Sequence, residues 1–82
     1  MRAIKDQSGK LIAQVIERSG LAGAQRAIEH LPSPSKWCVV LGDYDGAAPY
    51  WITTRREAAR LVAAGYEYAD ARDIPPTPAK SA

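Results

Sequence analysis

The chain has 82 residues, of which 46% are hydrophobic and 24% charged, and its formal net charge is +2. This length allows one small domain, and this composition excludes a chain that is disordered throughout. The single cysteine excludes an internal disulfide and a cysteine-rich zinc site, and the mildly basic charge permits nucleic-acid binding without indicating it.

The N-terminal segment and the overall hydropathy indicate a cytoplasmic protein. The first residues, MRAIKDQSGK, contain no apolar segment of signal-peptide length, and no apolar run in the sequence could span a bilayer. Frequent Ala and Arg without any Phe are typical of a GC-rich bacterial genome. Because the chain has one Cys and one His, we expect no metal site. We also expect no cofactor and no membrane partner.

The N-terminal part of the chain predicts a β-hairpin. Residues 2–6 form a short extended candidate, and residues 7–10 form a turn in which Gly9 can adopt a positive φ. Residues 11–17 (LIAQVIE) alternate and are rich in β-branched side chains, which favours a strand. A helix beginning in this segment is the alternative, because its apolar residues also fit helical spacing.

A helix over residues 21–30 follows the hairpin. Ser19 is its expected N-cap, and Pro32 and Pro34 end it because neither can continue the helical hydrogen-bond ladder. The apolar residues recur at helical spacing and should face the core. These residues are Leu21, Ala24, Ile28 and Leu31.

The second part predicts two strands. Residues 37–41 (WCVVL) are apolar on both faces, which is typical of a central strand. Residues 42–49 form a turn-rich loop, and residues 50–53 form the next strand.

A capped helix follows the second strand. Thr54 and Glu57 have the spacing of a capping box, and the helix runs to about Ala64, with Gly65 as its left-handed C-cap. Its buried positions should be Ala58, Leu61 and Val62. Residues 66–69 should then rejoin the sheet as a final strand.

These elements predict an α+β fold in the order ββαββαβ. We expect one antiparallel sheet with both helices packed on the same face. Residues 1–72 form the expected single domain, and residues 73–82 a flexible proline-rich tail.

The segment Asp43–Gly46 is the most motif-like part of the chain. An apolar strand followed by D-x-D-G resembles the first motif of haloacid dehalogenase-like phosphatases, which implies Asp43 as nucleophile and Asp45 as acid or base. Ala47 stands where that family has a threonine. Aspartates in turns also hydrogen-bond their own backbone, and we favour this interpretation and expect no enzyme.

Cys38 and His30 have structural interpretations. Cys38 lies in the middle of an apolar strand, whereas a nucleophilic thiol needs a lowered pKa and partial exposure. His30 falls at the end of the first predicted helix, where an imidazolium interacts favourably with the helix dipole. We therefore expect a buried cysteine and a capping histidine.

Arg55, Arg56 and Arg60 are the main candidates for binding. In a helix that begins after Thr54, Arg56 and Arg60 lie one turn apart on an outer face. Arginines near a helix N-terminus oppose the helix dipole, which suggests contact with phosphate or with an acidic partner. A solvated helix face is the alternative.

Tyr50 and Trp51 are adjacent in a strand and point to opposite faces of the sheet. If both helices cover one face, one of these rings lies on the open face, where it would form a binding or self-association surface. The proline-rich tail is an alternative cover for that ring.

The sequence therefore favours a small non-enzymatic interaction module. It would bind a protein partner, or a second copy of itself, through an aromatic sheet face and an arginine-bearing helix edge. The alternative is a nucleic-acid-binding module in which the arginines contact phosphates beside a stacking aromatic ring. Both hypotheses use the same residues, Tyr50, Trp51, Arg55, Arg56 and Arg60.

Overall fold

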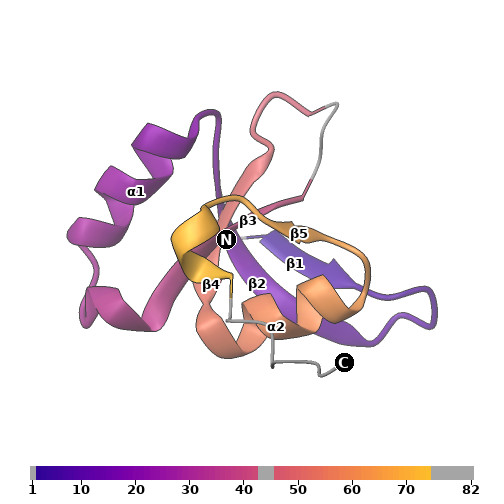
Figure 1. Cartoon of the computed structure of the whole chain (residues 1–82). Helices are drawn as coiled ribbons and strands as arrows, with labels where there is room; N and C mark the ends of the chain where they lie inside the picture. Colours follow the sequence, from indigo (N-terminus) through magenta and orange to yellow (C-terminus); the bar gives the residue numbers. More distant parts are fainter. Residues whose placement is uncertain (1, 43–45, 75–82) are drawn as a thin grey trace, which may run out of the picture.

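A computed structural model of the chain describes residues 2–42 and 46–74 (Figure 1). The elements in the described residues follow the predicted order, with two short 3-10 helices, η1 and η2, in addition. The bounds are β1 Arg2–Lys5, β2 Leu11–Arg18, α1 Leu21–Glu29, η1 Pro34–Lys36, β3 Trp37–Leu41, β4 Tyr50–Thr54, α2 Arg55–Ala63, β5 Glu67–Tyr68 and η2 Ala71–Asp73.

The strands form one five-stranded sheet in the order β1-β2-β4-β3-β5, and every neighbouring pair is antiparallel. The central pair, β3 and β4, matches along its whole length, from Trp37 opposite Thr54 to Leu41 opposite Tyr50. The predicted α+β class with a single antiparallel sheet is confirmed, and so is the strand at residues 11–17.

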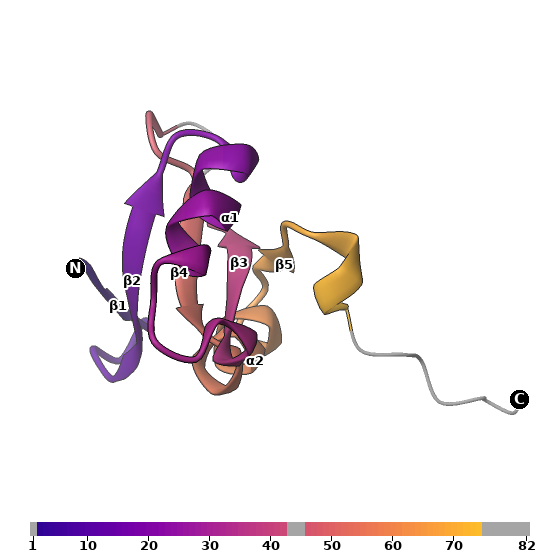
Figure 2. The same cartoon turned by 90° about the vertical axis from the view of Figure 1, so that its left-hand side faces the viewer.

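The two helices lie on opposite faces of the sheet, so the prediction that they share a face is wrong. Successive residues of a strand point to opposite faces. On one face, Ala24 and Ile28 of α1 pack with Val39 and Ile52, and Figure 2 shows α1 lying across β3 and β4.

On the other face, α2 covers the alternate residues of the same strands. Its buried Ala58 and Leu61 pack with a set of strand residues: Ile4, Ala13, Val15, Cys38, Val40 and Trp51. The central strands are apolar on both sides, and each side takes one helix as its cover. The sheet therefore has two cores rather than one core and one open face.

The β1–β2 turn is built around Asp6. Its Oδ1 accepts hydrogen bonds from the backbone N–H groups of Ser8 and Lys10 and from the Ser8 hydroxyl. These contacts, with the Ser8 side chain first, lower the pKa of Asp6. Gly9 adopts the predicted positive φ of 87°, and the hairpin is thus defined by local interactions.

Helix α1 begins at Leu21 as predicted, but its N-cap lies one residue later than expected. Gly20, in extended backbone, occupies the N-cap position without a side-chain hydrogen bond, so the prediction of Ser19 as N-cap is wrong. His30 is the C-cap residue, at the predicted end of the helix, and its backbone N–H donates to the Ala27 carbonyl, while the Leu31 N–H donates to the Ile28 carbonyl. Packing of its buried face, rather than capping, therefore holds the start of α1.

Helix α2 has the predicted capping interaction, and its glutamate also reaches the sheet. The Thr54 hydroxyl accepts from the Glu57 backbone N–H at 3.3 Å and donates to the Glu57 carboxylate at 3.0 Å. The second carboxylate oxygen of Glu57 accepts from the Gln14 backbone N–H at 3.0 Å, and the Thr53 hydroxyl donates to the Gln14 carbonyl. Thr53 at the end of β4 and Glu57 in α2 thus supply hydrogen-bond partners for the backbone N–H and carbonyl of Gln14, where β2 is no longer paired with β4.

The chain after α2 returns to the sheet as predicted. Gly65 has a φ of 114°, which glycine adopts without the steric penalty that a Cβ would add, and β5 then pairs with β3. Asp43 and Asp45 and the proline-rich residues 75–82 lie outside the described residues. Within residues 2–42 and 46–74, neither helix has the length and apolar character needed to cross a membrane.

Candidate interaction surface around helix α2

The outward side of α2 carries two exposed arginines, Arg56 and Arg60. Arg56 and Arg60 are exposed and stand four residues apart, opposite the buried Ala58 and Leu61. Among the described residues, neither guanidinium forms an ion pair or a side-chain hydrogen bond. Their positions confirm the predicted outer face of this helix.

A hollow of about 570 Å³ lies between α2 and the β1–β2 hairpin, and we call it the hairpin-side hollow. Its lining includes Leu11, Ile12, Arg60 and Ala63, with Lys10 at the turn. Leu11 is 47% exposed, so its apolar side chain is available at this hollow.

A second hollow, of about 600 Å³, lies on the other side of α2, and we call it the β5-side hollow. Its lining is mainly apolar and aromatic and includes Val62, Tyr66, Tyr68 and Ile74. Ile74 is 55% exposed. Leu11 and Ile74 are the exposed large hydrophobic residues in the described part of the chain, so one lines each hollow beside α2.

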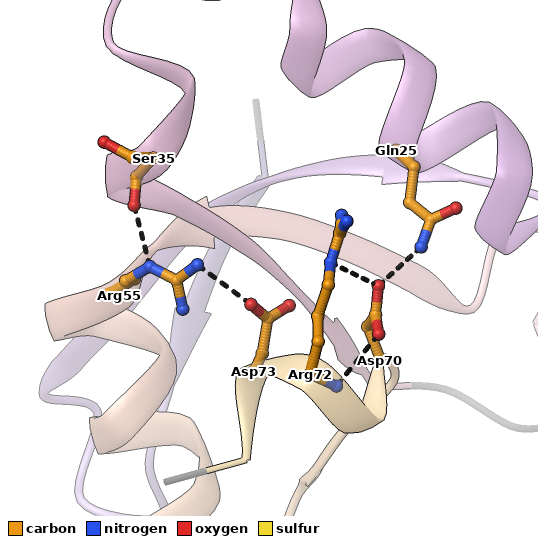
Figure 3. Close-up of polar contacts among 6 residues, drawn as sticks. All are labelled: Gln25, Ser35, Arg55, Asp70, Arg72 and Asp73. Atoms are coloured by element: carbon orange, nitrogen blue, oxygen red, sulfur yellow. Dashed lines mark hydrogen bonds and ion pairs between the residues drawn. The ribbon is translucent and has the colours of Figure 1, made fainter.

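Arg55, unlike Arg56 and Arg60, forms a structural contact, which joins α2 to η1 and η2 (Figure 3). Its Nε donates to the Ser35 carbonyl at 2.8 Å, and its Nη2 lies 2.9 Å from Oδ1 of Asp73. The Asp73 side chain is only 2% exposed, whereas that of Arg55 is 51% exposed. The approach to Oδ1 is not aligned for a hydrogen bond, so the contact is an ion pair at the edge of the core.

Asp70 forms a second contact of the C-terminal segment, beside the first (Figure 3). It caps η2 by accepting from the Arg72 backbone N–H, and it also accepts from the Gln25 amide and pairs with the Arg72 guanidinium at 2.8 Å. These interactions, with the backbone hydrogen bond first, lower the pKa of Asp70. Residues 70–73, which include the start of the segment predicted as a tail, are thereby attached to α1 and α2.

Tyr50 and Trp51 do not form an open aromatic face. Trp51 is 2% exposed in the core under α2, with its ring centroid 5.1 Å from that of Tyr66 and 5.5 Å from the Arg2 guanidinium carbon. Tyr50 is half-buried in the α1 core. Because a helix covers each face of the sheet, the condition for an exposed ring on β4 is not met.

Cys38 is 1% exposed in the α2 core, as predicted. Burial, together with the nearby negative charge of Asp73, raises the pKa of its thiol to about 11. The described residues contain no group of three or more His, Cys, Asp or Glu side chains that could hold a metal ion. The raised pKa is the opposite of what a nucleophilic thiol requires, so Cys38 is a structural residue of the core.

The chain was compared with protein families, curated proteins and solved structures. No protein-family model, curated protein or solved structure matches it. The candidate surface is therefore defined by its own geometry.

Sequence reasoning missed the apolar part of this surface. Tyr66 and Tyr68 were expected in the sheet, and Leu11 and Ile74 were not singled out. The alternation of Tyr66 and Tyr68 after the helix C-cap was the available signal, because residues two apart share one face of a strand. The exposure of Leu11 and Ile74 depends on how far the helix extends over the sheet, which no local pattern shows.

Proposed function

We propose that this protein is a non-enzymatic protein-interaction module that binds its partner on the outward side of α2 and in the two flanking hollows. One observation carries the proposal. The exposed Leu11 and Ile74 lie on either side of a helix whose Arg56 and Arg60 have no partner among the described residues. Apolar contacts beside arginines are typical of protein interfaces, in which Arg and Tyr are enriched.

The chemistry of the surface defines the partner. The hairpin-side hollow of about 570 Å³, which has both apolar and charged lining residues, and the mainly apolar β5-side hollow of about 600 Å³ can accept hydrophobic side chains. Arg56 and Arg60 between them favour carboxylates, which a guanidinium binds through two parallel hydrogen bonds. The expected partner is a protein segment in which apolar and acidic side chains alternate across one face.

The nucleic-acid alternative has less support. Its stacking residues were Tyr50 and Trp51, which are half-buried and buried in the two cores. Arg55, one of its three phosphate contacts, is paired with Asp73. Single-stranded nucleic acid needs exposed aromatic rings beside cations, and no such pairing with β4 is available here.

A display library of random peptides tests the proposal without knowledge of the natural partner. Peptides selected on the wild-type protein should be enriched in acidic and apolar residues. They should bind the Arg56→Glu/Arg60→Glu variant more than about tenfold more weakly. Leu11→Ser and Ile74→Ser should each weaken binding without a change in charge.

The matched control is Arg18→Glu/Arg26→Glu, which makes the same charge change at exposed positions outside the two hollows. Selected peptides should bind this control as they bind the wild type. Equal loss in both charge-reversed variants, or no enrichment of acidic peptides, would overturn the proposal. Binding of single strands or duplexes at low salt that is lost in Arg56→Glu/Arg60→Glu but kept in the serine variants would favour the nucleic-acid alternative. Sedimentation of the wild type and of these variants shows whether the protein self-associates through the same surface.

A further inference from the structure

A third hollow, of about 460 Å³, lies at the start of α2, and we call it the basic hollow. Its lining residues are Ser35, Lys36, Thr54, Arg55 and Arg56. The described lining contains three cationic side chains and no carboxylate. Neither Tyr50 nor any residue of the two flanking hollows belongs to it.

The pairing of the central strands brings these cations together. Trp37 at the start of β3 lies opposite Thr54 at the end of β4. Lys36 precedes Trp37 and Arg55 follows Thr54, so the two residues line the same hollow although they are far apart in the sequence. The cluster is thus set by sheet register rather than by a local run of basic residues.

Two of the three positive charges are not compensated. Arg55 is oriented by the Ser35 carbonyl and paired with the buried carboxylate of Asp73. Lys36 and Arg56 have no acidic partner among the described residues. Arg55 and Arg56 also occupy the first turn of α2, where the helix dipole disfavours cations. A cluster of like charges in an unfavourable field is stabilised by a bound anion.

We propose that the basic hollow binds a dianionic phosphate monoester carried by a phosphorylated side chain of the protein partner; this inference rests on the proposed function. A phosphate monoester carries close to two negative charges at neutral pH and has three acceptor oxygens. Its charge matches the two uncompensated cations, whereas a carboxylate or a phosphate diester would neutralise only one of them.

The available donors fit the same group. The Arg56 guanidinium, the Lys36 ammonium and the Ser35 hydroxyl have no side-chain hydrogen-bond partner among the described residues. The Thr54 hydroxyl is already used at the helix cap, where it donates to Glu57. Arg56 also belongs to the outward side of α2, so a phosphate in the basic hollow would lie at one end of the proposed interface.

Titration of the ¹⁵N-labelled protein with phenyl phosphate tests the inference. Saturable shifts are expected at the amides of Ser35, Lys36 and Arg56. Phenyl phosphate should bind at least about tenfold more tightly than dimethyl phosphate or benzoate. Lys36→Gln should abolish this preference, and Arg26→Gln, which removes one charge from exposed α1, should preserve it. Equal affinity for the three ligands, or shifts unaffected by Lys36→Gln, would overturn the inference.

The source of the phosphate is tested with a peptide from the display selection, made with serine or phosphoserine. The phosphoserine form should bind about tenfold more tightly, and Lys36→Gln should remove the gain. If inorganic phosphate binds as tightly as the phosphopeptide, the inference that the phosphate is carried by the protein partner is overturned. Leu11→Ser should weaken both peptides and leave phenyl phosphate unchanged. Peptide binding without phosphate preference would therefore defeat this inference alone, and phenyl phosphate binding without any peptide binding would defeat the proposed function.

Discussion

The guanidinium of Arg55 lies 2.9 Å from the buried carboxylate of Asp73 and so joins the first turn of α2 to the last described turn of the chain. The two partners are not equivalent, because the Asp73 side chain is 2% exposed and that of Arg55 is 51% exposed. Removing the exposed partner leaves a buried charge, whereas neutralising the buried partner leaves a cation that water can solvate.

Arg55→Met should therefore destabilise the protein more than Asp73→Asn does. We expect a loss of about 2–3 kcal/mol in the free energy of unfolding for Arg55→Met and about 1 kcal/mol for Asp73→Asn. Urea denaturation of both variants and of the double variant measures this difference and the coupling between the sites. The reverse order of the two losses would show that Asp73 does not depend on Arg55.

Glu57→Ala should cost about 2 kcal/mol, because it removes the acceptor of the Gln14 backbone N–H as well as part of the α2 cap. Urea denaturation with tryptophan fluorescence measures the loss. Glu29→Ala is the matched control, since Glu29 is an exposed helical glutamate without a side-chain hydrogen bond among the described residues. Equal losses for the two variants would argue against the role of Glu57 in joining β2 to α2.

Gly42→Ala and Gly23→Ala should change stability in opposite directions. A Cβ at Gly42 would lie 2.2 Å from Cδ2 of the buried Trp51 ring, so we expect a loss of about 3 kcal/mol. A Cβ at Gly23, inside α1, would meet nothing within 4 Å. Alanine has the higher helix propensity, so a gain of about 0.5–1 kcal/mol is expected there. Thermal unfolding of the two variants provides the comparison, and a stable Gly42→Ala variant would contradict the close packing against Trp51.

The Cys38 thiol should not react with a disulfide reagent while the protein is folded. Its side chain is 1% exposed, and burial raises its pKa to about 11, so little thiolate is present at pH 8. Labelling should proceed only as fast as the chain unfolds and should become complete in denaturant. Rapid labelling of the native protein would mean that the α2 core opens readily.

Asp70 should contribute to stability at neutral pH and not in acid. Its pKa is lowered in the folded protein from the ordinary 3.8, mainly by the Arg72 backbone N–H. Stability from a lowered carboxyl pKa is present above the unfolded-state value and is lost as the pH falls through the folded-state value. Asp70→Asn should therefore be less stable than the wild type near pH 7, and the difference should shrink below pH 3.8. Urea denaturation across this range tests it, and a difference independent of pH would contradict the assignment.

Local features were readable from the sequence. The Gly9 turn, the Thr54–Glu57 cap and the left-handed Gly65 each depend on residues a few positions apart, and all three are present as predicted. Residues 37–41 are apolar on both faces, and this local pattern identified a central strand. Helix α1 starts at Leu21 as predicted, but its N-cap is Gly20, the residue directly before the helix, rather than Ser19.

The candidate surface was only partly predictable. Helical spacing placed Arg56 and Arg60 on the outer side of α2. Helical spacing did not distinguish Arg55 from Arg56 and Arg60. The partner of Arg55 is Asp73, which follows β5 and is distant from α2 in the sequence. The prediction that either Tyr50 or Trp51 lies on an open face was wrong, because the sequence alone does not show which helix covers which face of the sheet.

Side-chain periodicity and local hydrogen bonding are enough to predict the order of the elements, the central strand and the outer side of α2. The placement of the helices on opposite faces, the pairing of Arg55 with Asp73 and the position of Lys36 and Arg56 in one hollow arise only in the folded chain. Those relationships depend on strand register and on packing between segments distant in the chain, and no local pattern of residues specifies either.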